Sequence, residues 1–443
     1  MKIYFLSLGC DKNLADSSHM LGLLSKEYEI TDICEDADIA FVNTCAFIND
    51  AKDESVNTIL ELAELKKNNL KFLVISGCLS QRYYEDLKNL IPEIDGFLGI
   101  SAINNVLSDL QRIVAGEKVY DLPDINLSQH IVEKRFMAPP FHYAYLKIAE
   151  GCDKKCSYCS IPNIRGNYRS IPKEELIKEA KYLAENGASE LILVAQETTV
   201  YGQDLYNEKY LPKLLNELSE IEGIEWIRVL YAYPEEIDDN LIEVIKTNRK
   251  VCKYLDIPIQ HSSDSILLRM GRRTSNEDLR RIISKLRKEI PDIALRTSLI
   301  TGFPGETEED HRNLIDFVKE IGFDKLGVFK YSREEGTLAY NFDDQVKASV
   351  KNRRQKEIMK LQAEISMELN SKFKDRVTKA IIDGYDPQND VYIGRIYRDA
   401  PDVDGCVFIE NATNLISGSF VNVHITDYDK YDLIGEICDE SCE

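Results

Sequence analysis

Apolar residues in the first 125 positions gather in short runs that are separated by longer amphipathic stretches. The runs KIYFLSLGC, IAFVNTC and KFLVISGC have the length and composition of buried strands. Stretches at about 14–26, 50–68 and 81–90 follow them and repeat apolar residues with helical spacing. Because strands that alternate with helices usually pair in parallel, residues 1–125 are expected to form a parallel-sheet domain.

The same alternation returns over residues 143–345, after a segment that contains Pro139 and Pro140 and shows little periodicity. That segment, residues 126–142, is expected to be a linker. The apolar runs beyond it are YAYLKIA, ELILVAQ, WIRVLYA, YLDIPIQ, ALRTSLI and KLGVFKYS. Six consecutive strand–helix units predict a partial barrel of parallel strands, whose site lies at the carboxyl ends of the strands.

The pattern changes again in the last part of the chain. Residues 346–371 are expected to form one long connecting helix. Four runs of alternating residues follow, RVTKAIID, VYIGRIY, GCVFIEN and SFVNVHITDYD, and turns rich in Gly and Asp separate them. Residues 372–443 therefore predict a small β-barrel, and the whole chain is expected to be a three-domain protein of the α/β class.

Composition and charge restrict the class of protein further. The chain has 443 residues, of which 44% are apolar and 30% charged, as in globular proteins of more than one domain. Its net charge of −21 disfavours a surface that binds phosphate backbones, and it suits either a basic partner or simple solvation. No membrane helix of roughly 20 apolar residues and no secretion signal are recognised, so a cytoplasmic location is expected.

Three cysteines fall within eight positions of the stretch EGCDKKCSYCSIPNIRG. Cys152, Cys156 and Cys159 come directly after the first strand of the predicted partial barrel. A zinc site would need a fourth ligand nearby, and His142 lies before that strand, while a disulfide would leave one thiol over. A four-iron cluster that is held by three thiolates keeps one iron open for a small molecule. The spacing favours this cluster over zinc or a disulfide.

A second set of cysteines ends the three strands of the amino-terminal region. Cys10, Cys45 and Cys78 are 35 and 33 residues apart, and parallel strands bring their carboxyl ends to one edge of a sheet. A single buried cysteine often serves packing alone, but three at equivalent positions favour a second metal cluster. The other cysteines are expected to be packing or surface residues: Cys34, Cys252, Cys406, Cys438 and Cys442.

The motif CDKKCSYC resembles that of the radical S-adenosylmethionine enzymes, with Tyr158 as the aromatic residue before the last cysteine. The resemblance implies that the open iron holds S-adenosylmethionine, whose reductive cleavage gives a 5′-deoxyadenosyl radical. It also implies contacts to the methionine portion by Gln196, Glu197, Tyr201 and Asp204. Contacts to the ribose and adenine are implied for Arg296, Gly302, Gly305 and Glu306. The stretch GFPGE is equally consistent with a turn before a helix.

The segments SLGCDKNLADS, FVNTCAFINDAKDESVNTI and ISGCLSQRY resemble the amino-terminal domain of methylthiotransferases, and the match extends over essentially the whole chain. The resemblance implies an auxiliary four-iron four-sulfur cluster on Cys10, Cys45 and Cys78, so that the chain holds two clusters. Asp11 stands where the family usually has proline, at a position that ligates no iron. The implied partners include an electron donor such as a flavodoxin or ferredoxin, and a sulfur source.

The substrate of such an enzyme is either an adenosine of transfer RNA or a ribosomal protein. Residues 371–443, which resemble a TRAM-type substrate-binding domain, hold seven basic and fifteen acidic residues, a net charge of −8. Such a barrel would repel RNA and attract a basic protein. GRIYRDAPDVDG also resembles the RimO type. This implies that the chain methylthiolates the β-carbon of an aspartate in ribosomal protein S12, free or on the small ribosomal subunit, and binds no transfer RNA directly.

Two alternatives remain at this point: a transfer-RNA methylthiotransferase, and a non-catalytic ribosome-associated iron–sulfur sensor. The open iron position counts against the sensor.

The sequence leaves the roles of three further residues open. His261 follows a strand and either lines the site or packs in the interior. Arg395 and Arg398 either pair with a substrate carboxylate or stabilise their loop. If both clusters face one cavity, the amino-terminal domain must pack over the mouth of the partial barrel.

Overall fold

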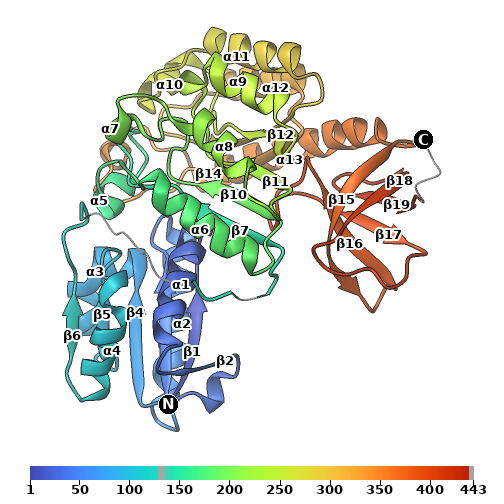
Figure 1. Cartoon of the computed structure of the whole chain (residues 1–443). Coiled ribbons are helices and arrows are strands. Elements are labelled where there is room, and N and C mark those ends of the chain that lie inside the picture. Colours follow the sequence, from blue (N-terminus) through green and yellow to red (C-terminus); the bar gives the residue numbers. More distant parts are fainter. Residues whose placement is uncertain (128–134, 138, 439–443) are drawn as a thin grey trace.

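The computed structural model describes residues 1–127, 135–137 and 139–438, which form three large β-sheets in succession (Figure 1). An open parallel sheet comes first, an open arc of parallel strands follows, and a closed barrel ends the chain. The expected α/β class, with a partial parallel barrel and a small carboxyl-terminal β-barrel, is confirmed. Part of the expected linker, residues 128–134 and 138, lies outside the described residues.

The amino-terminal sheet contains the three long strands that the sequence predicts and three short ones that it does not. The strand order is β2-β1-β3-β4-β5-β6, and each adjacent pair is parallel. The strands are β1 (Lys2–Ser7), β2 (Glu29–Thr31), β3 (Ile39–Thr44), β4 (Phe72–Ser76), β5 (Gly96–Leu98) and β6 (Val119–Asp121). The helices are α1 (Asp11–Leu24), α2 (Asn49–Leu65), α3 (Gly77–Leu90) and α4 (Val106–Val114), with the 3₁₀ helices η1 (Cys34–Asp36) and η2 (Ile103–Asn105).

The central arc has the strand order β14-β13-β12-β11-β10-β7, and all its pairs are parallel. Its strands are β7 (Tyr143–Lys147), β10 (Glu190–Val194), β11 (Trp226–Val229), β12 (Val251–Asp256), β13 (Ala294–Thr301) and β14 (Lys325–Lys330). The larger helices are α6 (Lys173–Glu185), α8 (Leu211–Ser219), α9 (Asp239–Thr247), α11 (Asn276–Glu289) and α12 (Glu308–Ile321). Shorter elements are β8 (Ala149–Glu150), α5 (Ile161–Arg165), β9 (Arg169–Ser170), α7 (Gln203–Tyr206), η3 (Pro234–Glu236), α10 (Asp264–Arg269) and η4 (Leu338–Asn341).

The carboxyl-terminal region begins with the long helix α13 (Ala348–Ser371) and closes into a barrel of order β15-β16-β17-β19-β18. The barrel strands are β15 (Val377–Asp386), β16 (Val391–Ile396), β17 (Val407–Glu410), β18 (Phe420–Tyr428) and β19 (Leu433–Ile437). The first four match the expected runs. The fifth strand, β19, is missing from the sequence prediction because Gly435 and Glu436 interrupt its apolar pattern.

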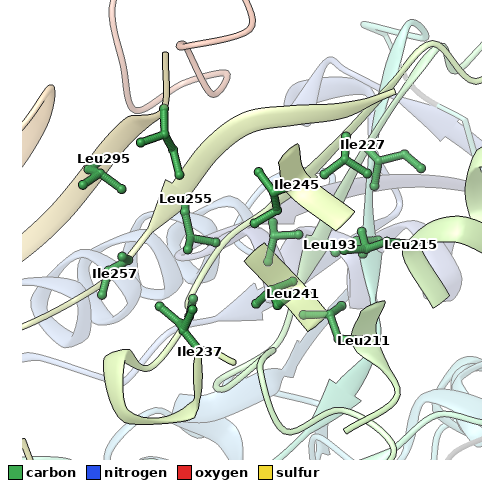
Figure 2. Packing of buried hydrophobic residues seen from close by; sticks show 14 of the residues in the cluster. Leu193, Leu211, Leu215, Ile227, Ile237, Leu241, Ile245, Leu255, Ile257 and Leu295 are labelled. Carbon is green, nitrogen blue, oxygen red and sulfur yellow. The ribbon is translucent and has the colours of Figure 1, made fainter. Parts of the chain in front are cut away.

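The main core lies between the arc and its outer helices (Figure 2). Leu193, Ile227, Leu255 and Leu295 come from four successive strands and pack against the face of α8 and α9. Each is fully buried, which stabilises the fold by about 1.5–3 kcal/mol per side chain. Because side chains alternate along a strand, the residues between them face the other, inner side of the arc.

The carboxyl-terminal barrel docks on that inner side. Tyr254 of β12 packs with Ala400 of the loop between β16 and β17, and its hydroxyl donates to Asp404 of the same loop at 2.7 Å. Arg228 of β11 donates to the carbonyl of Tyr397 at 2.6 Å. The loop therefore packs against the inner side of β11 and β12. Among the described residues, no helix has the length and apolar composition that a membrane crossing requires.

Candidate active site

Three cysteines of the amino-terminal sheet lie where β1, β3 and β4 end. Cys10 precedes α1, Cys45 follows β3, and Cys78 lies in the first turn of α3. The registers of the paired strands align their carboxyl ends, so these positions share one edge of the sheet. Cys10, Cys45 and Cys78 together form the Cys10 set.

The thiols of the Cys10 set lie close enough to influence one another. Cys45 and Cys78 are buried, whereas Cys10 is exposed. Burial raises the pKa of the Cys78 thiol to about 12, Arg165 lowers this pKa, and the Cys45 and Cys10 thiols raise it. The structure thus brings together the three cysteines that the sequence places at strand ends.

Two neighbouring residues fix the backbone at Cys45. Gly9 has φ +91°, and a Cβ atom there would lie 2.6 Å from the Cβ atom of Cys45 and 2.9 Å from its Sγ atom. Ser55 of α2 accepts a hydrogen bond from the Cys45 amide at 3.1 Å and donates one to the Cys45 carbonyl at 3.0 Å. Only glycine at position 9 is compatible with the close approach of Cys45.

A second set of cysteines lies on the loop between β8 and α5, at the carboxyl end of β7. Cys152, Cys156 and Cys159 form this Cys152 set, and the first two are buried. The Cys152 amide donates to the carbonyl of Gly166 at 3.1 Å, and the Cys159 amide donates to the carbonyl of Cys156 at 3.1 Å. These bonds curl the loop so that three thiols face one region, where burial raises the pKa of Cys152 to about 12.

Three thiols in each set match the ligand chemistry of a four-iron four-sulfur cluster, and the assignment of a cluster to each set stays a prediction. Within the described residues, no three side chains of His, Cys, Asp or Glu are close enough to hold one metal ion. In a four-iron cluster each thiolate binds a different iron, so its ligands stand farther apart than those of zinc. Each set offers three thiols in mutual electrostatic contact, which agrees with this wider spacing.

Gln196 and Glu197 lie just beyond β10, beside the Cys152 set. Gln196 Nε2 donates to Glu150 Oε1 at 2.8 Å, and Glu197 Oε2 lies 3.8 Å from Lys154 Nζ. Burial raises the pKa of Glu197 to about 7. Gln196 Oε1 and Glu197 Oε2 are buried and accept no hydrogen bond from the described residues, so these oxygens can accept one from a polar ligand.

An aromatic and cationic group adjoins the Cys152 set; the sequence motif includes Tyr158, whereas Tyr233 and Arg272 carry no sequence signal. Tyr158 is partly buried against the apolar cluster that contains Met270 and Phe303. The Tyr233 hydroxyl lies 3.8 Å from Cys156 Sγ, and the Arg272 guanidinium lies 4.3 Å from the Tyr233 ring centroid. The Tyr233 hydroxyl and the neighbouring Arg272 guanidinium thus lie close to Cys156, which is buried.

The turn GFPGE is closed by contacts within the chain. Glu306 accepts hydrogen bonds from the Gly302 and Phe303 amides and pairs with Arg354 of α13 at 2.9 Å. A side chain at Gly302 would clash with Lys351 of α13. A Cβ atom at Gly305 would lie 2.7 Å from Asp344 Oδ2. These contacts are those expected of a turn before a helix, and a cofactor role of Gly302 and Gly305 stays a prediction.

Three other residues expected near S-adenosylmethionine make contacts within the chain, and their cofactor role stays a prediction. The Tyr201 hydroxyl donates to the carbonyl of Ile171 at 2.8 Å, and Asp204 accepts from the Ser170 amide at 2.8 Å. Arg296 is paired with Asp256 at 2.9 Å and with Asp404 at 3.5 Å, on the inner side of the arc. Its guanidinium is thus occupied by carboxylates of the chain itself.

The structure also decides the role of two residues that the sequence left open. Arg395 pairs with Glu190 at 2.7 Å and with Asp383 at 2.7 Å, and Arg398 pairs with Asp324 at 2.7 Å. Both arginines therefore stabilise the docking of the carboxyl-terminal barrel.

His261 and Cys252 are both buried in the central domain. His261 is buried, and its Nδ1 atom accepts from the Ser263 amide at 2.9 Å. Its Nε2 atom has no hydrogen-bond partner among the described residues. Cys252 packs in an apolar cluster, as expected for a packing residue. Cys442 lies outside the described residues.

The two cysteine sets are joined by polar residues that the sequence analysis missed. Arg165 of α5 donates to Glu150 of β8 at 2.8 Å, to Asp16 of α1 at 3.1 Å, and to Asn13 of α1. At the other edge of the arc, Lys52 of α2 pairs with Glu334, just beyond β14, at 2.9 Å. The amino-terminal domain therefore lies over the carboxyl ends of β7 and β14, as expected if both sets face one site (Figure 1).

Sequence profiles of three known families match successive parts of the chain. The Radical SAM superfamily matches residues 146–318, and the uncharacterized protein family UPF0004 matches residues 2–99. The TRAM domain matches residues 376–438. The matched ranges contain the Cys152 set, the Cys10 set and the closed barrel, respectively.

Curated relatives resemble the chain over its full length. A protein of Lachnoclostridium phytofermentans is 54% identical over 98% of this chain and 99% of its own. A protein of Acetivibrio thermocellus is 50% identical over 99% of both chains, and one of Clostridium tetani is 47% identical over 100% and 99%. All three are named ribosomal protein uS12 methylthiotransferase RimO.

Solved structures share the fold at low sequence identity. The radical S-adenosylmethionine methyltransferase TsrM from Kitasatospora setae has a TM-score of 0.55 and 15% identity, over 74% of this chain and 72% of its own. The cobalamin-dependent enzyme OxsB has a TM-score of 0.52 and 13% identity, over 81% and 56%. A large part of this chain therefore shares its fold with these two proteins.

Proposed function

Because the chain belongs to the RimO family of radical S-adenosylmethionine methylthiotransferases, we propose that it inserts a methylthio group at the β-carbon of an aspartate of ribosomal protein uS12. The observation that carries this proposal is the juxtaposition of two three-cysteine sets across Arg165. A reaction that joins sulfur, a methyl group and a substrate carbon needs two neighbouring sites with an open position each.

In this proposal the Cys152 set holds one four-iron four-sulfur cluster and the Cys10 set holds a second. When bound, the clusters and S-adenosylmethionine supply the radical, the methyl group and the sulfur. Gln196 and Glu197 provide the buried oxygens that bind the amino group of the methionine portion. Tyr158 and Tyr233 keep water from the site, and Arg165 holds the two cysteine loops together.

The surface of the carboxyl-terminal barrel supports a basic protein as the partner rather than transfer RNA. Part of the barrel's charge faces the arc: Arg395 and Arg398 are buried there, and so is the carboxylate side chain of Asp404. The exposed remainder is still rich in acids, including Asp375, Asp390, Glu410, Asp427, Asp429 and Glu436. Such a surface attracts a basic ribosomal protein and repels phosphates, so an RNA substrate is disfavoured. An electron donor such as a flavodoxin or ferredoxin, a sulfur source and a cytoplasmic location belong to the same proposal.

The test is a mass measurement on the substrate. Anaerobically reconstituted protein is incubated with S-adenosylmethionine, a reductant and uS12, and one aspartate is expected to gain about 46 Da, the mass of CH₂S. Cys45→Ala is expected to abolish the gain. Cys34→Ala, a change of a half-buried cysteine in the same domain, should preserve it. Unmodified uS12 after incubation with fully loaded protein would overturn the proposal.

A further inference from the structure

Asn13 touches the loops of all three cysteines in the Cys10 set. It lies in the first turn of α1, three residues after Cys10, and it is fully buried. Its Nδ2 atom donates to the carbonyl of Leu8 at 2.9 Å and to the carbonyl of Thr44 at 2.9 Å. Its Oδ1 atom lies 4.0 Å from Cys78 Sγ. One amide thus ties the turn before Cys10, the residue before Cys45 and the thiol of Cys78.

The chemistry of these contacts requires an amide. Both N–H groups of Asn13 are used by the two carbonyls, while its oxygen faces a donor and a thiol. An aspartate at this position would offer no donor and would place a charge beside the two carbonyl oxygens. An alanine would remove this partner from the buried carbonyl of Thr44 and from the half-buried carbonyl of Leu8, and a buried carbonyl without its partner is unfavourable.

The oxygen of Asn13 also connects the Cys10 set to the other cysteine loop. It accepts a hydrogen bond from Arg165 Nη2, and Arg165 Nη1 reaches Glu150 Oε2, two residues before Cys152. Arg165 is 2% exposed, so this connection runs through the interior. Because its geometry is held by hydrogen bonds on both nitrogens, the guanidinium acts as a rigid spacer between the two loops.

The charges around Arg165 balance within a small group. Asp16 and Glu150 each pair with both Lys147 and Arg165, so two acids face two bases. Buried ion pairs of this kind add little net stability compared with apolar packing, because apolar residues in the same space would carry no desolvation penalty for charges. A role in orientation explains the presence of the network better than a role in stability alone.

We propose that Asn13 is a positioning residue, which fixes the spacing of Cys10, Cys45 and Cys78 and, through Arg165, the separation between the two cysteine sets. The inference rests on the proposed function, which assigns a cluster to each set. Asn13 touches neither substrate nor reacting atoms in this scheme. Its effect is expected on the properties of the auxiliary cluster before any turnover occurs.

The first experiment isolates the Cys10 set. In a Cys152→Ala, Cys156→Ala, Cys159→Ala background, the chain is reconstituted with ferrous iron and sulfide, and about four irons per chain are expected. Asn13→Ala and the nearly isosteric Asn13→Asp are each expected to lower the retained iron at least about twofold and to shift the g-values of the reduced cluster in electron paramagnetic resonance. Asn370→Ala is the matched control, because Asn370 is buried and donates to the Asp429 carbonyl far from either set.

The outcomes separate this inference from the proposed function. If the background protein retains no iron, the auxiliary cluster is wrong and this inference falls with it. If it retains iron, and the folded Asn13→Asp protein matches Asn370→Ala in iron content and spectrum, only the positioning role is overturned. Circular dichroism shows whether each variant is folded. If Asn13→Ala is unfolded, the folded Asn13→Asp protein alone decides whether Asn13 has a positioning role.

The second experiment tests the connection through Arg165 in the chain with all six cysteines. Arg165→Met is expected to leave about eight irons per chain and to change the magnetic interaction between the two reduced clusters. Arg165→Lys keeps the positive charge but not the two N–H groups that bond Asn13 and Glu150 at once. It should therefore restore the magnetic interaction only in part. An unchanged interaction in Arg165→Met would overturn the spacer role.

Discussion

Glu190 on β10 and Arg395 on β16 form a buried ion pair, with 2.7 Å between Oε2 and Nη1, that joins the central arc to the carboxyl-terminal barrel. Arg228 pairs with the other oxygen of Glu190 at 2.8 Å. Two guanidinium groups therefore share one carboxylate where the barrel docks. The carboxylate of Glu190 is fully buried, so the two guanidinium groups must compensate its negative charge.

Removal of Arg395 is expected to destabilise the whole chain. Arg395→Ala leaves Glu190 and Asp383 with one partner fewer each, and breaking a buried pair in this way costs roughly 3–5 kcal/mol. The thermal midpoint, followed by calorimetry, should fall clearly. Arg376→Ala, which removes an exposed arginine of the same region, should change it little. Equal midpoints for the two variants would contradict the docking role.

The stability of the protein is expected to fall in mild acid because of His261. Burial lowers the pKa of His261 from 6.5 to about 3, with smaller effects from Asp310, which raises it, and from His311 and Arg354, which lower it. Since the folded pKa is the lower one, the unfolded chain takes up the proton first, and stability is lost as the pH falls from 6.5 toward 3. The loss is about 1.4 kcal/mol per pH unit, or about 2 kcal/mol by pH 5.

Urea unfolding at pH 7.5 and at pH 5 checks this expectation. His261→Gln cannot take up the proton, so the difference between its two free energies of unfolding should be smaller than that of the unchanged chain. The same difference in both proteins would show that other groups cause the acid sensitivity.

Gly9 offers a direct test of the close approach to Cys45. Gly9→Ala and Gly116→Ala both place alanine at a positive φ, which costs about 1 kcal/mol in each case. At Gly116 the added Cβ atom has nothing within 4 Å, whereas at Gly9 it meets Cys45. Only Gly9→Ala is therefore expected to lower the iron content of the Cys10 set, measured in the background that lacks the Cys152 set. Similar iron contents in the two variants would rule out a steric role for Gly9.

Recognition of a basic substrate should depend on exposed acids of the carboxyl-terminal barrel. Asp427→Lys combined with Asp429→Lys reverses two exposed charges and is expected to raise the KM for uS12 about two- to tenfold at low salt. Kinetics over a range of ionic strength should show the difference shrinking as salt increases. Glu64→Lys, an exposed change on the amino-terminal domain, serves as the control. If it has the same effect, net charge rather than the barrel surface determines binding.

The sequence is sufficient to predict the long strands and both cysteine sets, because each rests on a local pattern. Apolar runs of five or more residues mark β1, β3 and β4, and the position of a cysteine at each strand end follows from parallel pairing. The three-residue strands β2, β5 and β6 carry too few residues for such a pattern, and tertiary pairing alone defines them. The helix α1 begins at Asp11, before the expected start near residue 14, because the residues of its first turn are polar.

The residues that connect the two sets have no such signal. Asn13 and Arg165 are 152 positions apart, and each is an ordinary polar residue in its own segment. The glycines of GFPGE show the converse: their pattern predicts a close approach, but it does not say whether a ligand or the chain itself approaches. Lys351 of α13 approaches Gly302, and a local motif cannot reveal a partner so distant in sequence.

The five strands from β15 to β19 form a ring in which the last neighbour, β18, pairs again with the first. A ring has no free strand edge, so an extended peptide cannot lengthen this sheet through main-chain hydrogen bonds, the mode known as β-augmentation. Any partner of this domain must therefore bind through the side chains and loops of the barrel.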